Sequence, residues 1–174
     1  MFKTILAPLD GSDHATKAAG LAAELAKTYG AKLIFLHVTL QGEAPAQLRR
    51  LAEIEHLVEP APAEQPPVAN IPAGLGAALR EIQEGRQSQA VYQALGQQIL
   101  DIAERAARAG GVARIETRLV GGDPTDQIIK AAEGAAADVI VMGSRGVGDL
   151  KGLLLGSVSH KVASLAPCTC ITVK

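Results

Sequence analysis

Residues 138–146 have the sequence Asp-Val-Ile-Val-Met-Gly-Ser-Arg-Gly, and this stretch decides the fold of the chain. Its apolar residues form the most hydrophobic strand candidate in the sequence, of the kind expected where helices cover both faces of a strand. Glycines at positions 143 and 146 then open a glycine-rich loop, and a short helix follows. The stretch therefore predicts a buried parallel strand whose carboxyl end leads into a loop rich in glycine.

The sequence on either side alternates strands with helices. Further strands are predicted over residues 3–9, 32–38, 114–120 and 168–173. Helices are predicted from Ser12 or Asp13 to Gly30, over residues 91–109 and over residues 124–136. This alternation indicates a Rossmann-like, doubly wound α/β fold, in which an open parallel sheet has helices on both faces. Ligands of such sheets bind beyond the carboxyl ends of the strands, here next to Asp10 and Gly143.

Residues 41–90 interrupt the alternation and are predicted to form an insertion after the second strand. Residues 47–58 favour one amphipathic helix, and residues 73–85 favour a helix that continues, with or without a break, into the helix over 91–109. Prolines at positions 60, 62, 66, 67 and 72 indicate an extended, exposed link between them. We expect one domain over residues 1–174, with an insertion that packs on the sheet's helices or on a partner subunit, or forms a lid.

Composition excludes several classes of function. The 174 residues carry a net charge of −1, and the pI near 6.4 gives no basic surface for nucleic acid. Aromatic residues make up 2% of the chain, which leaves no platform for stacking bases or sugars. Apolar runs are too short to span a membrane or to form the core of a signal peptide, so we expect a cytoplasmic protein that does not bind membranes.

The cysteines and histidines give no sign of a metal site. Cys168 and Cys170 lie two residues apart on the last predicted strand, which favours a reduced pair over a strained mutual disulfide. The four histidines lack the spacing typical of metal ligands. We therefore expect no metal held by side chains, and we interpret His37 and His160 as structural residues.

The glycine-rich segment over residues 143–161 is the strongest candidate site. Its glycines let backbone amides approach an anion, and the start of the following helix favours negative charge. Ser157 and Ser159 add hydroxyl donors. Positive charge comes from Arg145, Lys151 and Lys161. The dinucleotide and P-loop patterns do not fit, because Lys151 and Asp149 stand where they require glycine and lysine. A phosphate site is one interpretation, and a loop with ordinary helix caps is the other.

Three separated stretches carry sequence patterns of one known protein family. The spacing Gly143-x2-Gly146-x9-Gly156-Ser157 is similar to the pattern that marks the ATP-binding branch of the universal stress protein family. The opening Ile-Leu-Ala-Pro-Leu-Asp-Gly-Ser over residues 5–12 resembles the family's start, and residues 157–173 resemble its end. The resemblance covers residues 1–40 and about 90–174, so only the insertion falls outside it.

The resemblance implies an adenine nucleotide α-hydrolase-like sheet of five parallel strands that binds ATP, AMP or ADP, with any Mg²⁺ held by the phosphates. It implies phosphate contacts from the glycine loop and the last helix, nucleoside contacts from the end of the first strand, and a backbone contact that recognises adenine. The residues implied are Pro8, Asp10, Val38, Met142, Gly143, Arg145, Gly146, Gly156, Ser157, Val158 and Ser159.

These residues favour a binding protein over an enzyme. Fast hydrolysis of ATP requires a positioned base or water-orienting group and a metal-held phosphate chain, and neither Asp10 nor Asp149 is an evident base. We expect a stress-response regulator without catalytic residues, whose conformation or dimer contacts depend on the bound nucleotide. A slow ATP hydrolase and a dimeric interaction module that binds no nucleotide are the alternatives.

The last predicted strand is a candidate for self-association. As a sheet edge it would expose unpaired amides and carbonyls, and pairing with a second copy would remove that edge. The resemblance also implies dimers of this kind. We therefore expect a homodimer with two-fold symmetry through Thr169–Val173. The sequence does not identify the protein client of such a regulator.

Overall fold

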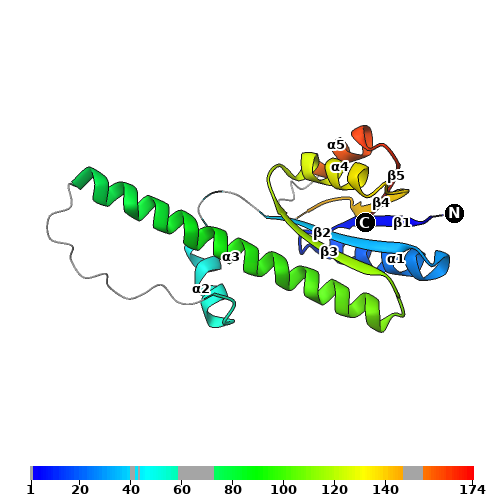
Figure 1. The fold of residues 1–174 in the computed structure, drawn as a ribbon, viewed down its shortest axis with the longest axis horizontal. Helices are drawn as coiled ribbons and strands as arrows, with labels where there is room; N and C mark the ends of the chain where they lie inside the picture. Colours follow the sequence, from blue (N-terminus) through cyan, green and yellow to red (C-terminus); the bar gives the residue numbers. More distant parts are fainter. Residues whose placement is uncertain (1, 40–41, 43, 59–72, 147–154) are drawn as a thin grey trace. The chain divides into compact units, whose positions relative to one another are not determined.

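A five-stranded parallel sheet forms the centre of one of the two units of the chain. The computed structural model describes residues 2–39, 42, 44–58, 73–146 and 155–174. The sheet unit comprises Met1–Thr39 with Gly96–Lys174, and the second unit comprises Leu40–Leu95. The strands are β1 (Thr4–Pro8), β2 (Lys32–Thr39), β3 (Ile115–Gly121), β4 (Val139–Gly143) and β5 (Thr169–Val173). Their order is β3-β2-β1-β4-β5 and all pairings are parallel, which confirms the predicted doubly wound fold (Figure 1).

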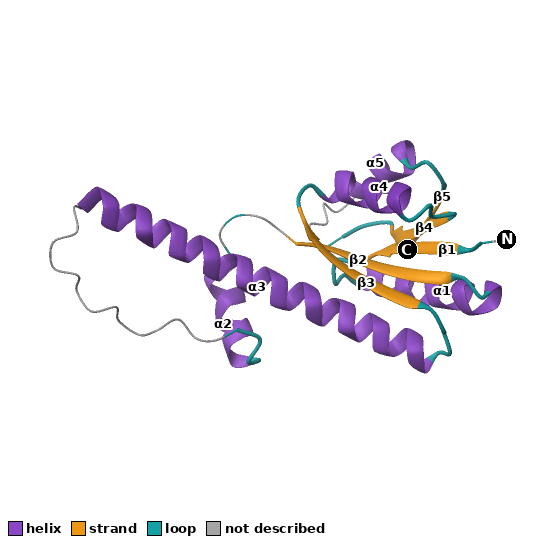
Figure 2. Ribbon diagram, viewed as in Figure 1, coloured by secondary structure: helices purple, strands orange, loops and turns teal. Residues whose placement is uncertain are grey.

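Helices cover both faces of this sheet (Figure 2). On one face lie α1 (Asp13–Tyr29) and residues 96–109 of α3 (Ala73–Ala109), and on the other lie α4 (Pro124–Gly134) and α5 (Ser157–Leu165). Successive side chains of a strand point to opposite faces. Ile5 of β1 therefore packs on the α1 side and Leu6 on the α4 and α5 side, and both are fully buried. The middle of each central strand is apolar and buried because both of its faces are covered.

The start and the end of α1 agree with the prediction from the sequence. The Ser12 hydroxyl accepts a hydrogen bond from the Ala15 amide at 3.2 Å, and Gly30 ends the helix in the left-handed conformation with φ of 60°. The side chains that α1 buries are all alanines, namely Ala15, Ala18, Ala22 and Ala26. Their small size brings the backbone of α1 close to the sheet, which matters for the glycine at the end of β4.

Two helices end earlier than predicted. The helix predicted over 124–136 ends at Gly134, because Ala136 adopts a φ of 46° and the chain turns back toward the sheet. The helix predicted over 47–58 is α2 (Ala46–Ile54), and His56 adopts a φ of 54° just after it. A non-glycine residue in the left-handed region gives no signal in the sequence, so both ends were predicted too late.

The second unit contains α2 and residues 73–95 of α3. Its described residues include a small cluster of buried side chains around Ala44, Ala52, Val91 and Tyr92. The fully buried Ser88 hydroxyl accepts a hydrogen bond from the Ala44 amide at 2.9 Å, which fixes the segment before α2 to α3. The helix α3 runs without a break from Ala73 to Ala109. The predicted proline-rich link lies outside the described residues, and the packing of the insertion on the sheet unit or a partner stays a prediction.

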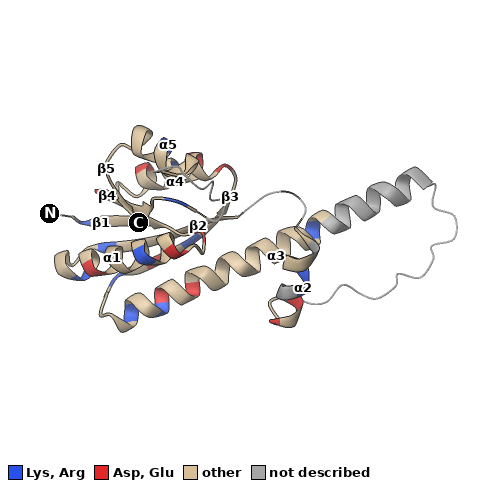
Figure 3. Ribbon diagram, turned by 180° about the vertical axis from the view of Figure 1, so that it is seen from behind, with Lys and Arg blue, Asp and Glu red and all other residues tan. Residues whose placement is uncertain are grey.

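The surface of the described residues shows two further features. Acidic and basic residues are interspersed along α1 and α3 (Figure 3). The strand β5 is an edge strand that pairs with β4, and Thr169 and Thr172 on it are exposed. None of the described helices is both long enough and apolar enough to cross a membrane.

Candidate functional site

The sequence-predicted site residues gather at the carboxyl edge of the sheet. Pro8 is the last residue of β1, and Val38 lies near the end of β2. Met142 and Gly143 end β4, and the half-buried Arg145 and Gly146 follow them. The remaining predicted residues cap and begin α5, namely Gly156, Ser157, Val158 and Ser159. Parallel strands bring these chain segments together although they are far apart in the sequence.

Gly143 lies where β4 meets the first turn of α1. A Cβ atom at this position would lie 2.9 Å from the Ala15 amide nitrogen and 3.0 Å from the His14 carbonyl carbon. Both neighbours are backbone atoms, which cannot move aside by changing rotamer. Glycine at 143 therefore allows α1 to start directly against the end of β4.

Gly146 lies against the carboxylate of Asp10. A Cβ atom at Gly146 would overlap Oδ2 of Asp10, and Oδ1 of the same carboxylate accepts a hydrogen bond from the Ser12 amide at 3.0 Å. The Ser12 hydroxyl lies 3.5 Å from the Arg145 carbonyl oxygen. The turn after β1 and the loop after β4 thus form one surface, with the Asp10 carboxylate between them.

Ser144 fixes both ends of the glycine loop. Its amide donates to the Val173 carbonyl at 2.7 Å, which ties the loop to the end of β5. Its carbonyl accepts hydrogen bonds from the Gly156 amide and from the Ser159 hydroxyl, each at 2.7 Å. These bonds hold the start of α5 beside the end of β4. Residues 147–154 of the predicted loop, with Asp149 and Lys151, lie outside the described residues.

The start of α5 is suited to an anion. Its N-cap is Gly156, which has no side chain to accept a hydrogen bond from the first turn, in contrast to Ser12 at the start of α1. The amides of the first turn of a helix carry partial positive charge and bind phosphate or carboxylate groups. Ser157 is exposed at the start of this turn, so its hydroxyl is accessible to a ligand.

Four of the predicted residues have packing roles, and Val38 is one of them, since it packs against the core on the α4 and α5 side. Met142 is 5% exposed, and it packs together with Val158 in the core on the α4 and α5 side. Ser159 is buried, and its hydroxyl is engaged with the Ser144 and Gly156 carbonyls. Gly156 has a φ of −70°, so its backbone does not require glycine.

A cavity of about 180 Å³ lies on this surface. It is lined by Ser12, Asp13, His14, Arg145 and Gly146. Sequence reasoning missed His14, whose Nδ1 lies 3.4 Å from the Ser144 hydroxyl. The signal that could have found it is its place in the first turn of the helix after the first strand, which faces the site in any sheet of this class.

Within the described part of the chain, no three histidine, cysteine or carboxylate side chains gather closely enough to hold a metal ion. The cysteines at the start of β5 are free and half-buried, and burial raises the pKa of both thiols.

Comparison with known proteins agrees with the fold and places the chain in a family. The model of the universal stress protein family matches residues 1–174. A universal stress protein of Thermus aquaticus is 34% identical over 174 residues, which cover 100% of both chains. One of Bacillus subtilis (strain 168) is 33% identical over 178 residues, again with 100% of both chains covered.

A solved structure shows the same fold. The crystal structure of a universal stress protein in complex with cAMP superposes with a TM-score of 0.61 at 25% identity, over 99% of this chain and 97% of that one. The family match over the full length includes the insertion, which the sequence resemblance had left outside. The chain therefore belongs to the universal stress protein family.

Proposed function

We propose that this protein binds an adenine nucleotide at the carboxyl edge of its sheet and acts as a stress-response regulator whose conformation depends on that nucleotide. The observation that supports this most directly is the junction at Ser144. Its carbonyl accepts hydrogen bonds from the Gly156 amide and the Ser159 hydroxyl at 2.7 Å, and the carbonyl of the next residue, Arg145, lies 3.5 Å from the Ser12 hydroxyl in the turn that follows Asp10. An anion-binding helix start beside a carboxylate is an arrangement suited to a phosphorylated ribose.

The proposal gives each part of the nucleotide a place. The phosphates lie at the amides of Gly156 and Ser157, with the hydroxyl of Ser157 and the charge of Arg145 beside them. Asp10 accepts hydrogen bonds from the ribose hydroxyls, and the backbone of Val38 contacts the edge of adenine. The relative with cAMP bound shows that this fold accommodates an adenine nucleotide in that protein. ATP is the nucleotide we propose here, and Mg²⁺ would accompany it on the phosphates.

The proposal assigns binding rather than fast hydrolysis. Hydrolysis requires a carboxylate or another base that orients a water molecule toward the terminal phosphate. The Asp10 carboxylate accepts a hydrogen bond from the Ser12 amide and lies against Gly146. In this fixed position the carboxylate is suited to bind the hydroxyls of a ribose. Slow hydrolysis remains the alternative function, and release of labelled phosphate at a rate above that of the Asp10→Asn variant would favour it.

Two substitutions at α5 test the nucleotide site. Ser157→Ala removes one charge-assisted hydrogen bond, which we expect to weaken ATP binding by about 10- to 150-fold. Gly156→Val should weaken it further, because a branched side chain fills the space of the phosphate. Calorimetric titration with ATP measures both affinities, and thermal unfolding of each variant shows that it is folded.

Ser164→Ala is the matched control for Ser157→Ala. Ser164 lies near the other end of α5, and its hydroxyl donates to the His160 carbonyl at 3.0 Å. We expect ATP affinity to stay unchanged in this variant. Equal affinity in folded Ser157→Ala and wild-type protein would move the phosphates elsewhere, and a wild-type protein that binds no ATP or cAMP would favour an interaction module without nucleotide.

The proposal also includes a homodimer through Thr169–Val173. β5 is an edge strand with exposed positions, so a second copy could extend the sheet across a two-fold axis. Light scattering at micromolar concentration should give twice the mass of the chain, and a monomer would contradict this part of the proposal. The cytoplasmic location and the protein client stay predictions.

A further inference from the structure

Helix α3 enters the sheet unit at Gly96, where its backbone lies very close to side chains of the sheet. A Cβ atom at Gly96 would lie 2.5 Å from Cδ2 of His37 and 2.7 Å from Cδ1 of Leu119. His37 is on β2 and Leu119 is on β3, so these side chains fill the space that any other residue at 96 would need. Glycine therefore lets the backbone of α3 rest directly on the imidazole ring of His37.

The ring of His37 in turn holds the turn after β1. Its Nδ1 lies 2.8 Å from the carbonyl oxygen of Leu9, and a carbonyl can only accept, so Nδ1 carries the proton. Burial lowers the pKa of His37, which keeps the ring neutral near pH 7. The Leu9 amide also donates to the Leu36 carbonyl at 2.8 Å. Both backbone groups of the residue before Asp10 are thus fixed.

Ile99 holds the same turn from the other side of Asp10. Its Cδ1 lies 3.0 Å from the position that a Cβ of Gly11 would take, and Gly11 has a φ of 83°. Residues three apart lie on one face of a helix, so Gly96 and Ile99 act on the sheet together. The residues on both sides of Asp10 are therefore held, directly or through His37, by a single face of α3.

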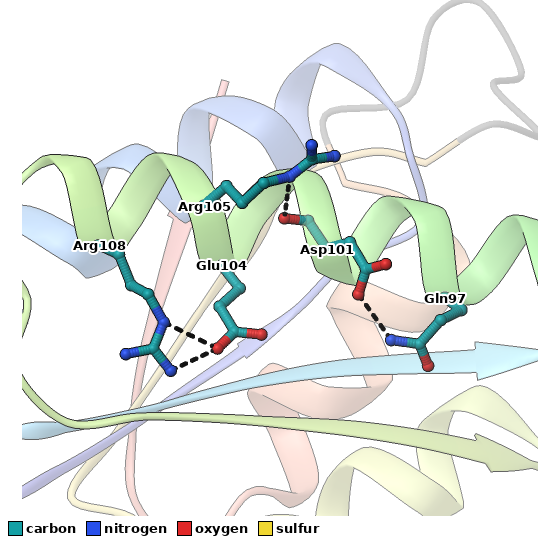
Figure 4. A network of polar contacts seen from close by, with 5 residues as sticks. All are labelled: Gln97, Asp101, Glu104, Arg105 and Arg108. Carbon is teal, nitrogen blue, oxygen red and sulfur yellow. Dashed lines mark hydrogen bonds and ion pairs between the residues drawn. The ribbon is translucent and has the colours of Figure 1, made fainter.

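The opposite face of α3 explains why this face is turned inward. Gln97 donates to Asp101 at 2.7 Å, the Nε atom of Arg108 donates to Glu104 at 3.0 Å, and the Nε atom of Arg105 donates to the Asp101 carbonyl at 3.1 Å (Figure 4). These contacts between residues four apart form an exposed polar stripe. With the stripe in water, the apolar side of the helix faces the sheet, and the rotation of α3 about its axis is set.

We infer that the Gly96–Ile99 face of α3 is a positioning element of the nucleotide site, which acts through His37 and Ile99 on residues 9–11 and so sets the direction of the Asp10 carboxylate. The inference rests on the proposed function, because Asp10 is a ligand of the nucleotide only there. It assigns His37 a role beyond packing. Without the His37 hydrogen bond, the Leu9 carbonyl loses this donor and the turn that carries Asp10 can adopt more conformations. Nucleotide binding then has to restrict that turn, which lowers the affinity.

Substitutions of His37 test the hydrogen bond. His37→Phe keeps a flat ring against Gly96 but removes the donor, and we expect ATP affinity to fall by about 3- to 10-fold. His37→Asn places an amide donor near the position of Nδ1, and we expect affinity within about 2-fold of wild type. A purely packing role predicts the reverse order, because asparagine loses the ring that phenylalanine keeps.

Two isoleucines on α3 give a matched pair for the second contact. Ile99→Ala removes the contact with Gly11 and should weaken ATP binding by about 3-fold, because the turn is less restricted. Ile102 is 56% exposed, and Ile102→Ala should leave affinity unchanged. Equal affinity in the two variants would overturn the inference. If His37→Phe fails to fold, this pair of variants decides the question.

A double-mutant cycle with Asp10→Asn tests whether His37 affects ATP affinity through Asp10. If His37 acts through Asp10, adding His37→Phe to Asp10→Asn should cause little further loss of affinity, whereas additive losses would contradict the inference. These experiments distinguish failure of the proposed function from failure of this inference alone. A wild-type protein that binds no ATP ends the proposed function and the inference with it, while normal binding by wild type, His37→Phe and Ile99→Ala ends the inference alone.

Discussion

The two units of the chain are built on different amounts of buried surface. The sheet unit has two separate cores, one on each face of five strands, and both include several fully buried side chains. Among the residues of the second unit whose burial the structure describes, one small cluster surrounds four buried residues, formed by α2, the segment before it and one stretch of α3. Hydrophobic stabilisation is roughly proportional to the apolar area removed from water. The sheet unit should therefore determine the stability of the protein, and the second unit should depend on it.

The largest difference in stability effect between the two units should come from one core substitution in each. Phe35 is fully buried in β2, and Phe35→Ala should lower the free energy of unfolding of the sheet unit by about 3–5 kcal/mol. Tyr92 is buried in the small cluster, and Tyr92→Ala should leave that transition almost unchanged while it loosens the second unit. Urea unfolding followed by circular dichroism, with limited proteolysis of residues 40–95, measures both effects. Equal losses of sheet stability would show that the units unfold as one.

A smaller effect is expected where the sheet meets α1. Gly143→Ala forces a methyl group against the backbone of α1, and we expect a loss of about 1–3 kcal/mol of stability together with weaker ATP binding. Gly20→Ala is the control, because Gly20 lies within α1 with open space around it and should gain about 0.4–1 kcal/mol. A stable Gly143→Ala protein with normal affinity would show that α1 can shift away from β4 at little cost.

Removing part of the second unit should cost still less. Deletion of residues 43–84 takes away α2 and the first part of α3 but leaves the helix that covers the sheet. We expect the shortened protein to melt cooperatively and to bind ATP with an affinity close to that of the full chain. Loss of cooperative melting would reverse the comparison, since the second unit would then be a necessary part of the fold.

The smallest expected effect concerns pH and the start of β1. The amides of Thr4 and Lys3 donate to the Asp138 carboxylate at 2.8 and 2.6 Å, and these bonds lower its pKa. A carboxyl group whose pKa is lowered by folding stabilises the fold above its ordinary pKa of about 3.9 and loses this contribution as the pH falls through the lowered value.

The wild-type melting temperature should therefore fall more between pH 6 and 3 than that of Asp138→Asn, with the two curves converging in acid. Parallel curves would show that these bonds give the folded state no preference for the ionised carboxylate. Because the carboxylate is exposed to solvent, the difference at neutral pH should be small compared with the effects above.

The sequence predicts the sheet unit better than its connections. Apolar runs identify all five strands, and Ser12 and Gly30 identify the ends of α1, because these signals are local. The ends of α2 and α4 were predicted too late, since His56 and Ala136 adopt positive φ without the glycine that usually marks it. Local patterns do not report such conformations, which the packing of neighbouring segments imposes.

Only part of the candidate site was predicted, again because local patterns do not report contacts between distant segments. Gly143, Gly146 and Asp10 belong to short patterns, and the structure brings them together. The contact of His37 with Gly96 depends on how α3 crosses β2, so no spacing in the sequence indicates it. His14 was missed as well, although its place in the first turn of the helix after the first strand is a signal in the sequence.

The parallel pairing of β2 with β3 has a consequence for how this lineage can change. The register runs from Leu33 opposite Ile115 to Thr39 opposite Gly121. The two strands pair directly in space although the whole second unit separates them in the sequence. The entropic cost of closing a loop rises only with the logarithm of its length, by about 0.6 kcal/mol for each doubling. Evolution can therefore lengthen, shorten or replace this connection at little thermodynamic cost, whereas a shift of one residue in a strand would turn its buried side chains to the opposite face.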